Sequence, residues 1–356
     1  MKSAANRRRR TLVLGAIPVV LTGALVSIDR IPGTDISLTV PYAAEGPGPT
    51  VNTLGDVDGV QVVAVKAPHV YDTDGNLNMT TVSVRTNMTL AQAFGRWLFT
   101  DDTIVPIETV IPQNMTDEEV EQSNKQAFTE SESAATVAAM DYLNLPLKIK
   151  VVDVLDGSPA SGKIQKDDEV TAIDGEEVTE PGQVQDRIRA KQPGDSVEVS
   201  VLRGGKELTS AVTLGSSPAD KKVSFLGLSM LSEPAEDITV DYNLQDIGGP
   251  SAGMMFTLAV IDKLSPGDLN GGKFVAGTGT IDESGTVGPI GGIEHKVRAA
   301  EEAGAQIFLA PADNCAEATK GANGDMVIAK VKSLQDATTA MDNFSQGKPV
   351  ETCQAG

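Results

Sequence analysis

A serine enclosed by small residues and followed by an apolar run is the most constrained local feature of this chain. The segment Gly248-Gly249-Pro250-Ser251-Ala252-Gly253 precedes residues 254–264, which have the composition of a buried helix. Proline is favoured in the first turn of a helix, so we expect Pro250 to open a helix and to place Ser251 at its start. The first N–H groups of a helix have no helical partner, and such groups are suited to binding an oxyanion.

Lys296 supplies a candidate base for this serine. It ends the segment Gly291-Gly292-Ile293-Glu294-His295-Lys296, and it follows Ser251 by 45 residues. A serine hydroxyl is a weak nucleophile, and the chain has only two histidines. A lysine kept neutral by burial is therefore the next plausible base, and the pair indicates an acyl-transfer site. The structural alternative is that Ser251 only caps a helix and Lys296 is a solvated charge.

Four segments in this order and spacing resemble the proteolytic domain of the Lon family of Ser-Lys peptidases. They are Gly249-Pro250-Ser251-Ala252-Gly253, Gly277-Thr278-Gly279, residues 287–293, and Lys296 leading into residues 299–304. The resemblance implies that Ser251 attacks the peptide carbonyl, that Lys296 acts as base and that Thr278 hydrogen-bonds the lysine. Gly249, Pro250 and Ala252 would support the serine, and the family's common hexameric ring suggests a homo-oligomer. The family usually has Asp where Gly248 stands.

Residues from about 147 to 215 resemble a PDZ domain of exported proteases. The match is carried by Val151-Val152-Asp153-Val154, Gly157-Ser158-Pro159-Ala160, Asp168-Glu169-Val170 and Ile173-Asp174-Gly175-Glu176-Glu177-Val178. Such domains bind an extended peptide as an added strand and often grip its C-terminal carboxylate on backbone N–H groups. The segment expected to form that loop, residues 143–146, lacks glycine and contains Pro146, which has no N–H. Binding of an internal segment or a purely regulatory role is the alternative.

The N-terminal residues predict a membrane anchor. Lys2 and four arginines at residues 7–10 precede residues 11–28, which contain no charge. A helix of this run would be about 27 Å long, close to the roughly 30 Å of a hydrocarbon core. Because the positive flank stays in the cytoplasm, we expect a single-pass protein of the cell membrane whose catalytic domain is extracytoplasmic. A cleaved signal peptide is the alternative, since Pro18 interrupts the run.

The two cysteines, Cys315 and Cys353, are relevant to the expected extracytoplasmic location. In an oxidising environment two thiols of one exported domain usually pair, so we expect a disulfide that ties the C-terminal tail back, with two unpaired thiols as the alternative. The two histidines and two cysteines have no ligand-like spacing, so neither a metal nor another cofactor is expected. The net charge of −20 argues against nucleic acid as a partner.

The expected fold class is α+β, with a Lon-type proteolytic domain and a small barrel-like PDZ domain preceded by one transmembrane helix. The expected order is a cytoplasmic basic tail (1–10), the anchor (11–28), a linker (29–54), an N-terminal part of the protease domain (55–145), the PDZ domain (146–215), a catalytic part (216–345) and a C-terminal tail (346–356). Two strands and one helix cannot bury a core alone, so we expect the PDZ domain to be inserted into the protease domain. Three consecutive domains are the alternative.

These features predict a membrane-anchored serine endopeptidase that acts without ATP. The chain contains no Gly-x-x-x-x-Gly-Lys-Ser/Thr segment, so no motor would unfold its substrates. The expected substrates are therefore unfolded or membrane-proximal protein segments, and the PDZ domain would bind peptides for substrate selection or gating. The alternative is a non-catalytic exported PDZ adaptor with a relic protease domain, although such an adaptor has no reason to keep both Ser251 and Lys296.

Overall fold

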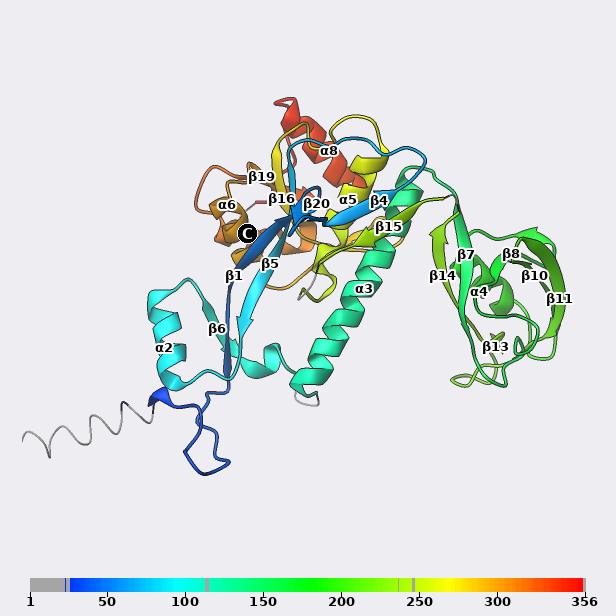
Figure 1. Ribbon diagram of the computed structural model, residues 1–356, viewed down its shortest axis with the longest axis horizontal. Coiled ribbons are helices and arrows are strands. Elements are labelled where there is room, and N and C mark those ends of the chain that lie inside the picture. The colour runs from blue at the N-terminus through cyan, green and yellow to red at the C-terminus, as the bar shows by residue number, and fades with distance from the viewer. Residues whose placement is uncertain (1–22, 24–25, 113–114, 236, 245–246, 355–356) are drawn as a thin grey trace, which may run out of the picture.

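The computed structural model describes residues 23, 26–112, 115–235, 237–244 and 247–354. Figure 1 shows a larger body, which contains both ends of the described chain, and a smaller body formed by the green segment. Most of the predicted anchor, residues 11–28, lies outside the described residues. Within the part of the chain that is described, no helix has the length and apolar character needed to cross a membrane.

A six-stranded mixed sheet organises the larger body. Its strand order is β20-β19-β16-β5-β1-β6, and the four strands from β20 to β5 run parallel while β1 and β6 alternate in direction. The strands span β1 (Tyr42–Asn52), β5 (Asn76–Arg85), β6 (Thr103–Pro106), β16 (Phe274–Gly277), β19 (Ile307–Pro311) and β20 (Val327–Val331).

Both faces of this sheet are covered by helices. Along β19, Ile307 and Leu309 belong to one core cluster, whereas Phe308 and Ala310 belong to another, as the period of two along a strand requires. The first cluster lies with α3 (Asp117–Tyr142), α5 (Gly253–Leu264) and α8 (Leu334–Ser345), and the second with α6 (Ile293–Glu302) and α7 (Cys315–Gly321). The sheet is therefore the middle layer of three.

Local sequence signals explain where the long helices begin. Helix α3 has a capping box, in which the Thr116 side chain accepts from the Glu119 N–H and the Glu119 side chain accepts from the Thr116 N–H. Helix α5 is buried from Gly253 to Lys263, which accounts for its lack of a polar stripe. It packs against α3 in the interior, and the two helices come from segments on either side of the smaller body.

The smaller body is a sheet of order β11-β10-β8-β7-β14 with one helix, α4 (Pro181–Arg189). Its strands are β7 (Leu147–Val154), β8 (Glu169–Ile173), β9 (Glu176–Glu177), β10 (Ser196–Arg203), β11 (Lys206–Thr213) and β14 (Leu228–Pro234). Because β14 pairs with β7, the expected end of this unit at residue 215 is too early, and the sheet extends to Pro234. The chain enters and leaves the unit at adjacent points, since the Ala235 N–H donates to the Pro146 carbonyl at 2.9 Å.

The expected linker over residues 29–54 is also incorrect in its second half. Residues 42–52 form β1, an internal strand of the main sheet between β5 and β6. Pro47 and Pro49 are unusual in an internal strand, because proline cannot donate to a ladder. The β1–β5 register shifts between Pro47 and Thr50, and this irregularity accommodates the prolines within the sheet.

The expected α+β class describes the molecule only coarsely. Helices and strands mix within one layered unit, because β16, β19 and β20 are joined in sequence through α6 and α7. One core contains residues 62–140 and residues 238–341, so segments before and after the smaller body bury a common apolar interior. Helix α2 (Leu90–Phe99) lies at the far end of β1 and β6 from this core (Figure 1).

Short elements complete the chain. They are β2 (Asp56–Val57), β3 (Val60–Gln61), β4 (Val63–Lys66), η1 (Ile107–Thr109), β12 (Gly215–Ser216), β13 (Ser224–Phe225), β15 (Thr239–Tyr242), η2 (Pro250–Ala252), β17 (Thr280–Ile281), β18 (Val287–Gly288) and η3 (Ala312–Asn314). A disulfide joins Cys315 at the start of α7 to Cys353, and the Cys353 N–H donates to the Ile328 carbonyl of β20. The C-terminal segment thus covers the edge strand of the main sheet.

Candidate active site

Ser251 lies in a short turn that leads into α5. The turn is the 3-10 segment η2, so the α-helix itself begins at Gly253, two residues later than Ser251. Gly249 has φ +84°, a conformation that favours glycine, and its N–H donates to the Asn124 carbonyl of α3. The Ser251 carbonyl accepts from the Gly279 N–H at 2.9 Å. The serine backbone is therefore fixed from both sides by neighbouring elements.

Thr278 joins the serine and the lysine. It follows β16 directly and is fully buried. The Lys296 Nζ donates to the Thr278 Oγ1 at 3.0 Å, and the Thr278 Oγ1 donates to the Ser251 carbonyl at 3.0 Å. The turn with Ser251 comes from one face of the sheet and α6 with Lys296 from the other, so the two layers meet at the carboxyl end of β16.

Burial changes the acidity of Lys296. Its side chain is 2% exposed, and this desolvation lowers the pKa of its ammonium group to about 8. Lys296 forms none of the ion pairs among the described residues, and the threonine hydroxyl that it contacts is neutral. A substantial fraction is therefore deprotonated in mildly alkaline solution, as a general base requires.

Ser251 and Lys296 line one cleft of about 280 Å³. Strand β5 contributes Met79, Thr81, Val82 and Ser83 to its lining, and the segment before and around Ser251 contributes Ile247, Gly248, Gly249 and Ala252, with Pro49 from β1. The sequence-predicted residues Gly249, Ala252, Ser251 and Lys296 thus meet at this cleft, and Thr278 lies behind it. Pro250 precedes the serine in η2 but is not part of the lining.

Two polar groups of Ser251 are free within the described part of the chain. Its hydroxyl makes no hydrogen bond there, and its backbone N–H has no acceptor. The hydroxyl can therefore approach a carbonyl carbon while the N–H contacts a developing oxyanion. Hydrogen bonds between catalytic groups are often long before substrate binds, so the bond of Lys296 to Thr278 alone is compatible with a dyad.

A second candidate site lies on the smaller body, between α4 and the edge strand β14. This groove has a volume of about 300 Å³. Val184 and Ile188 line it from α4, while Phe225 and Met230 line it from the opposite side. Because β14 is the last strand of its sheet, its outer edge can pair with an extended peptide.

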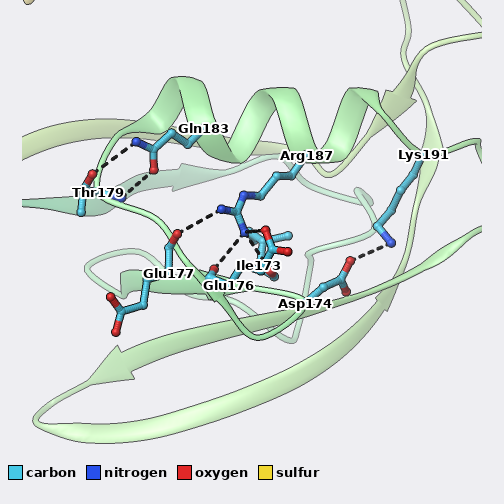
Figure 2. Close-up of polar contacts among 8 residues, drawn as sticks. All are labelled: Ile173, Asp174, Glu176, Glu177, Thr179, Gln183, Arg187 and Lys191. Atoms are coloured by element: carbon cyan, nitrogen blue, oxygen red, sulfur yellow. Dashed lines mark hydrogen bonds and ion pairs between the residues drawn. The ribbon is translucent and has the colours of Figure 1, made fainter.

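Polar contacts hold α4 in the orientation that forms this groove. Figure 2 shows the Arg187 guanidinium donating to the carbonyls of Ile173, Glu176 and Glu177. Two residues beyond the helix, the Lys191 Nζ forms an ion pair of 2.7 Å with Asp174. These contacts tie α4 to the β8–β9 turn.

The loop that closes one end of the groove is Phe225-Leu226-Gly227-Leu228. Gly227 has φ +85°, and a Cβ there would collide with Ser158. The carbonyls of Leu226 and Gly227 accept from the N–H groups of Ala160 and Leu155. The N–H groups of Leu226 and Gly227 have no acceptor among the described residues, so they are available to a carboxylate.

This loop corrects the expectation from the sequence. Residues 143–146 were expected to form the carboxylate-binding loop, a role that Pro146 already argued against, but they lead from α3 into β7 and are not part of the groove. The relevant strand follows the other PDZ strands in sequence instead of preceding them. Gly227 between two leucines was the available signal, and it lay beyond the boundary assigned to the unit.

Metal binding finds no support in the described segments, where no group of three or more His, Cys, Asp or Glu side chains is arranged to hold an ion.

Comparisons with known proteins identify two families in the chain. Residues 244–340 match the family model of the Lon protease (S16) C-terminal proteolytic domain, and residues 119–214 match that of a PDZ domain. The first match contains Ser251, Thr278 and Lys296. The second starts within α3 and ends before β14, so it omits the strand that completes the sheet in the structure.

Curated relatives cover only parts of the chain. The Lon protease of Roseiflexus castenholzii is 35% identical over 130 residues, which are 33% of this chain and 16% of that protein. The probable periplasmic serine endoprotease DegP-like of Rhizobium meliloti is 38% identical over 73 residues, 20% of this chain and 14% of that protein. The crystal structure of the PDZ domain of an SdrC-like protein from Listeria innocua is 26% identical, with a TM-score of 0.22, and covers 23% of this chain and 92% of that chain.

The family matches confirm both resemblances read from the sequence. The chain carries a PDZ domain and the proteolytic domain of the Lon-type serine endopeptidases of family S16.

Proposed function

We propose that this Lon-type serine protease with a PDZ domain is a membrane-anchored, ATP-independent endopeptidase in which Ser251 is the nucleophile and Lys296 is the general base. Its substrates are unfolded or exposed protein segments outside the cytoplasm. The single observation that supports this most strongly is the buried Lys296, which shares a cleft with Ser251 and is linked to it through Thr278.

The proposed reaction proceeds in two halves. Neutral Lys296 accepts the Ser251 proton while the hydroxyl oxygen forms a bond to the peptide carbonyl carbon, and the Ser251 N–H stabilises the oxyanion. The C–N bond then breaks, and the lysine returns the proton to the leaving amine. A water molecule, deprotonated by the same lysine, hydrolyses the acyl-enzyme and regenerates the serine.

The proposed location rests on the sequence. The basic residues 7–10 and the uncharged residues 11–28 favour a single span with the N-terminus in the cytoplasm. The Cys315–Cys353 disulfide supports an oxidising compartment, because structural disulfides are rare in the cytosol. This chain contains no phosphate-binding loop motif, so the proposed enzyme depends on segments that are already unfolded.

The proposed role of the PDZ domain is substrate selection. A peptide would pair with the free edge of β14, its side chains would contact Val184 and Ile188, and its terminal carboxylate would accept from the N–H groups of Leu226 and Gly227. We propose the domain as an insertion over residues 146–235 between the two parts of one protease domain. The adjacent entry and exit points support this division.

Incubation of the purified chain with unfolded casein, without ATP, tests the proposal. We expect the wild-type chain to release peptides, and the Ser251→Ala and Lys296→Ala variants each to lose this activity. Ser161→Ala and Lys348→Ala serve as matched controls, because both residues are exposed and remote from the cleft. Undiminished cleavage by the Ser251→Ala variant would refute the mechanism. An inactive wild-type chain would favour the adaptor function.

A further inference from the structure

Helix α2 presents an exposed apolar face on one side of the larger body. Leu90, Phe94, Trp97 and Leu98 are each more than half exposed, and Phe99 at the end of the helix is 80% exposed. At about 100° per residue, positions 90, 94, 97 and 98 lie within an arc of about 100°. Single exposed apolar residues are common, but a contiguous face of this kind marks an interaction surface.

We infer that this apolar face of α2 rests on the surface of the lipid bilayer next to the N-terminal anchor. The inference builds on the proposed function, which gives the chain its anchor. Helix α2 would lie in the interface with Phe94 and Trp97 among the lipid headgroups and first acyl carbons. The side of the helix that carries the buried Ala93 and the partly buried Arg96 would face the protein.

The path of the chain brings α2 close to the anchor. The Val40 N–H donates to the Met88 carbonyl at 2.9 Å, and Thr39 forms a bridge with Thr89, the cap of α2. Only 12 residues separate Ile28 from Val40, which span at most about 40 Å when extended. A bridge between Arg30 and Ser37 folds this segment and shortens its reach. Figure 1 shows these residues, in blue, beside α2.

The charges of α2 and of the whole chain favour an apolar contact with lipid over an electrostatic one. The only charged residue of α2 is Arg96, which is paired with Asp102, so the helix brings no net charge to the membrane. The chain as a whole carries a net charge of −20, and anionic lipids repel such a protein. Tryptophan and phenylalanine on an uncharged helix face provide attraction that does not depend on lipid charge.

The size of the face argues against a second copy of the chain as its occupant. A helix of 10 residues is about 15 Å long, and four side chains on it cover far less than the roughly 800 Å² per partner of a stable protein interface. Bilayer contact requires no such area, because the anchor already holds the helix at the membrane and makes its insertion an intramolecular event.

Trp97 allows a direct test, because it is the only tryptophan of the chain. The full chain is reconstituted into phosphatidylcholine vesicles whose acyl chains carry bromine near the headgroup, and into matched vesicles without bromine. We expect bromine to quench the Trp97 emission by roughly twofold or more, because an interfacial helix buries its apolar face by about 5–10 Å. Phe94→Ser with Leu98→Ser should reduce this quenching, whereas Leu155→Ser with Leu208→Ser, two exposed leucines of the PDZ domain, should not.

Flotation of the vesicles separates the failure of this inference from the failure of its premise. A chain that does not float with the vesicles would reject the anchor and, with it, the bilayer contact. A floating chain whose Trp97 emission is unaffected by bromine would overturn the inference alone. Emission that instead changes with protein density in the vesicles would assign the face to a second copy. In the variant Trp97→Phe with Leu208→Trp, the relocated tryptophan should remain unquenched.

Discussion

At the scale of single residues, the candidate site depends on how burial changes Lys296. Desolvation lowers its pKa to about 8, and among the described residues its Nζ donates only to the neutral hydroxyl of Thr278. The folded protein therefore stabilises the neutral amine, the form that accepts a proton. The motifs and their spacing singled out Ser251, Lys296 and Thr278, and the structure brings these three residues together. The burial of Lys296 and the position of Thr278 between Ser251 and Lys296 could not be read from the sequence, because both depend on the fold.

The pH dependence of cleavage follows from this pKa. Below the pKa of about 8 the lysine is mostly protonated and cannot act as base; above it the neutral form dominates. We therefore expect kcat/KM for a peptide substrate to rise about tenfold per pH unit below pH 8 and to level off above it. Lys296→Arg should abolish activity, since arginine stays protonated. A profile that is flat from neutral to alkaline pH, with chemistry rate-limiting, would exclude lysine as the base.

Substitution of Thr278 tests whether it positions the lysine. Thr278→Val removes both hydrogen bonds of the hydroxyl but keeps the shape of the side chain, whereas Thr278→Ser keeps the hydroxyl. We expect the valine variant to lose about 10- to 100-fold in kcat with little change in KM, and the serine variant to retain most activity. The pH at which kcat/KM levels off should also move in the valine variant. Equal loss in both variants would indicate a packing role instead.

At the scale of elements, the sequence predicted local structure better than pairing. The helix expected over residues 254–264 agrees closely with α5, because a continuous apolar run of this length is a local signal. Strand β1 was missed, since a bulge that admits Pro47 depends on its partner β5. Strand β14 was missed because it completes the PDZ sheet by pairing with β7, which lies about eighty residues earlier.

The C-terminal segment offers a test at this scale. The disulfide closes a loop of 38 residues and holds residues 351–353 against β20. Loop entropy alone predicts that Cys353→Ser lowers the free energy of unfolding by about 4 kcal/mol. Urea unfolding monitored by circular dichroism measures this difference, and reductant should destabilise the wild-type chain but not the variant. An unchanged midpoint in the variant would show that the bond contributes nothing to stability.

At the scale of the whole molecule, the protease and PDZ units have separate hydrophobic cores. The protease core combines residues 62–140 with residues 238–341, and the PDZ core is a separate cluster within residues 149–226. The sequence predicted an insertion because neither half of the protease could bury a core alone. It could not predict the boundary, which depends on the pairing of β14 with β7.

Removal of the PDZ domain tests this modular arrangement. Because Pro146 and Ala235 are hydrogen-bonded neighbours, replacement of residues 147–234 by a short Gly/Ser linker closes a small gap at little entropic cost. We expect the deletion protein to be folded and to cleave a short peptide with unchanged kcat, but to lose selectivity among protein substrates. Leu208→Ser serves as the control variant, because it changes an exposed residue of the PDZ domain and leaves the groove intact. A soluble deletion protein without peptidase activity would show that the PDZ domain helps to build the active site.

The most direct test of the Ser251-Lys296 dyad is covalent labelling of the full chain with a small serine-directed acylating reagent, followed by peptide mass spectrometry. We predict a single adduct on Ser251 whose rate of formation increases with pH through about 8, as the pKa of Lys296 requires. Lys296→Ala should label far more slowly, and Ser251→Ala should not label at this position. Labelling of Ser251 at the same rate with and without Lys296 would contradict the central claim.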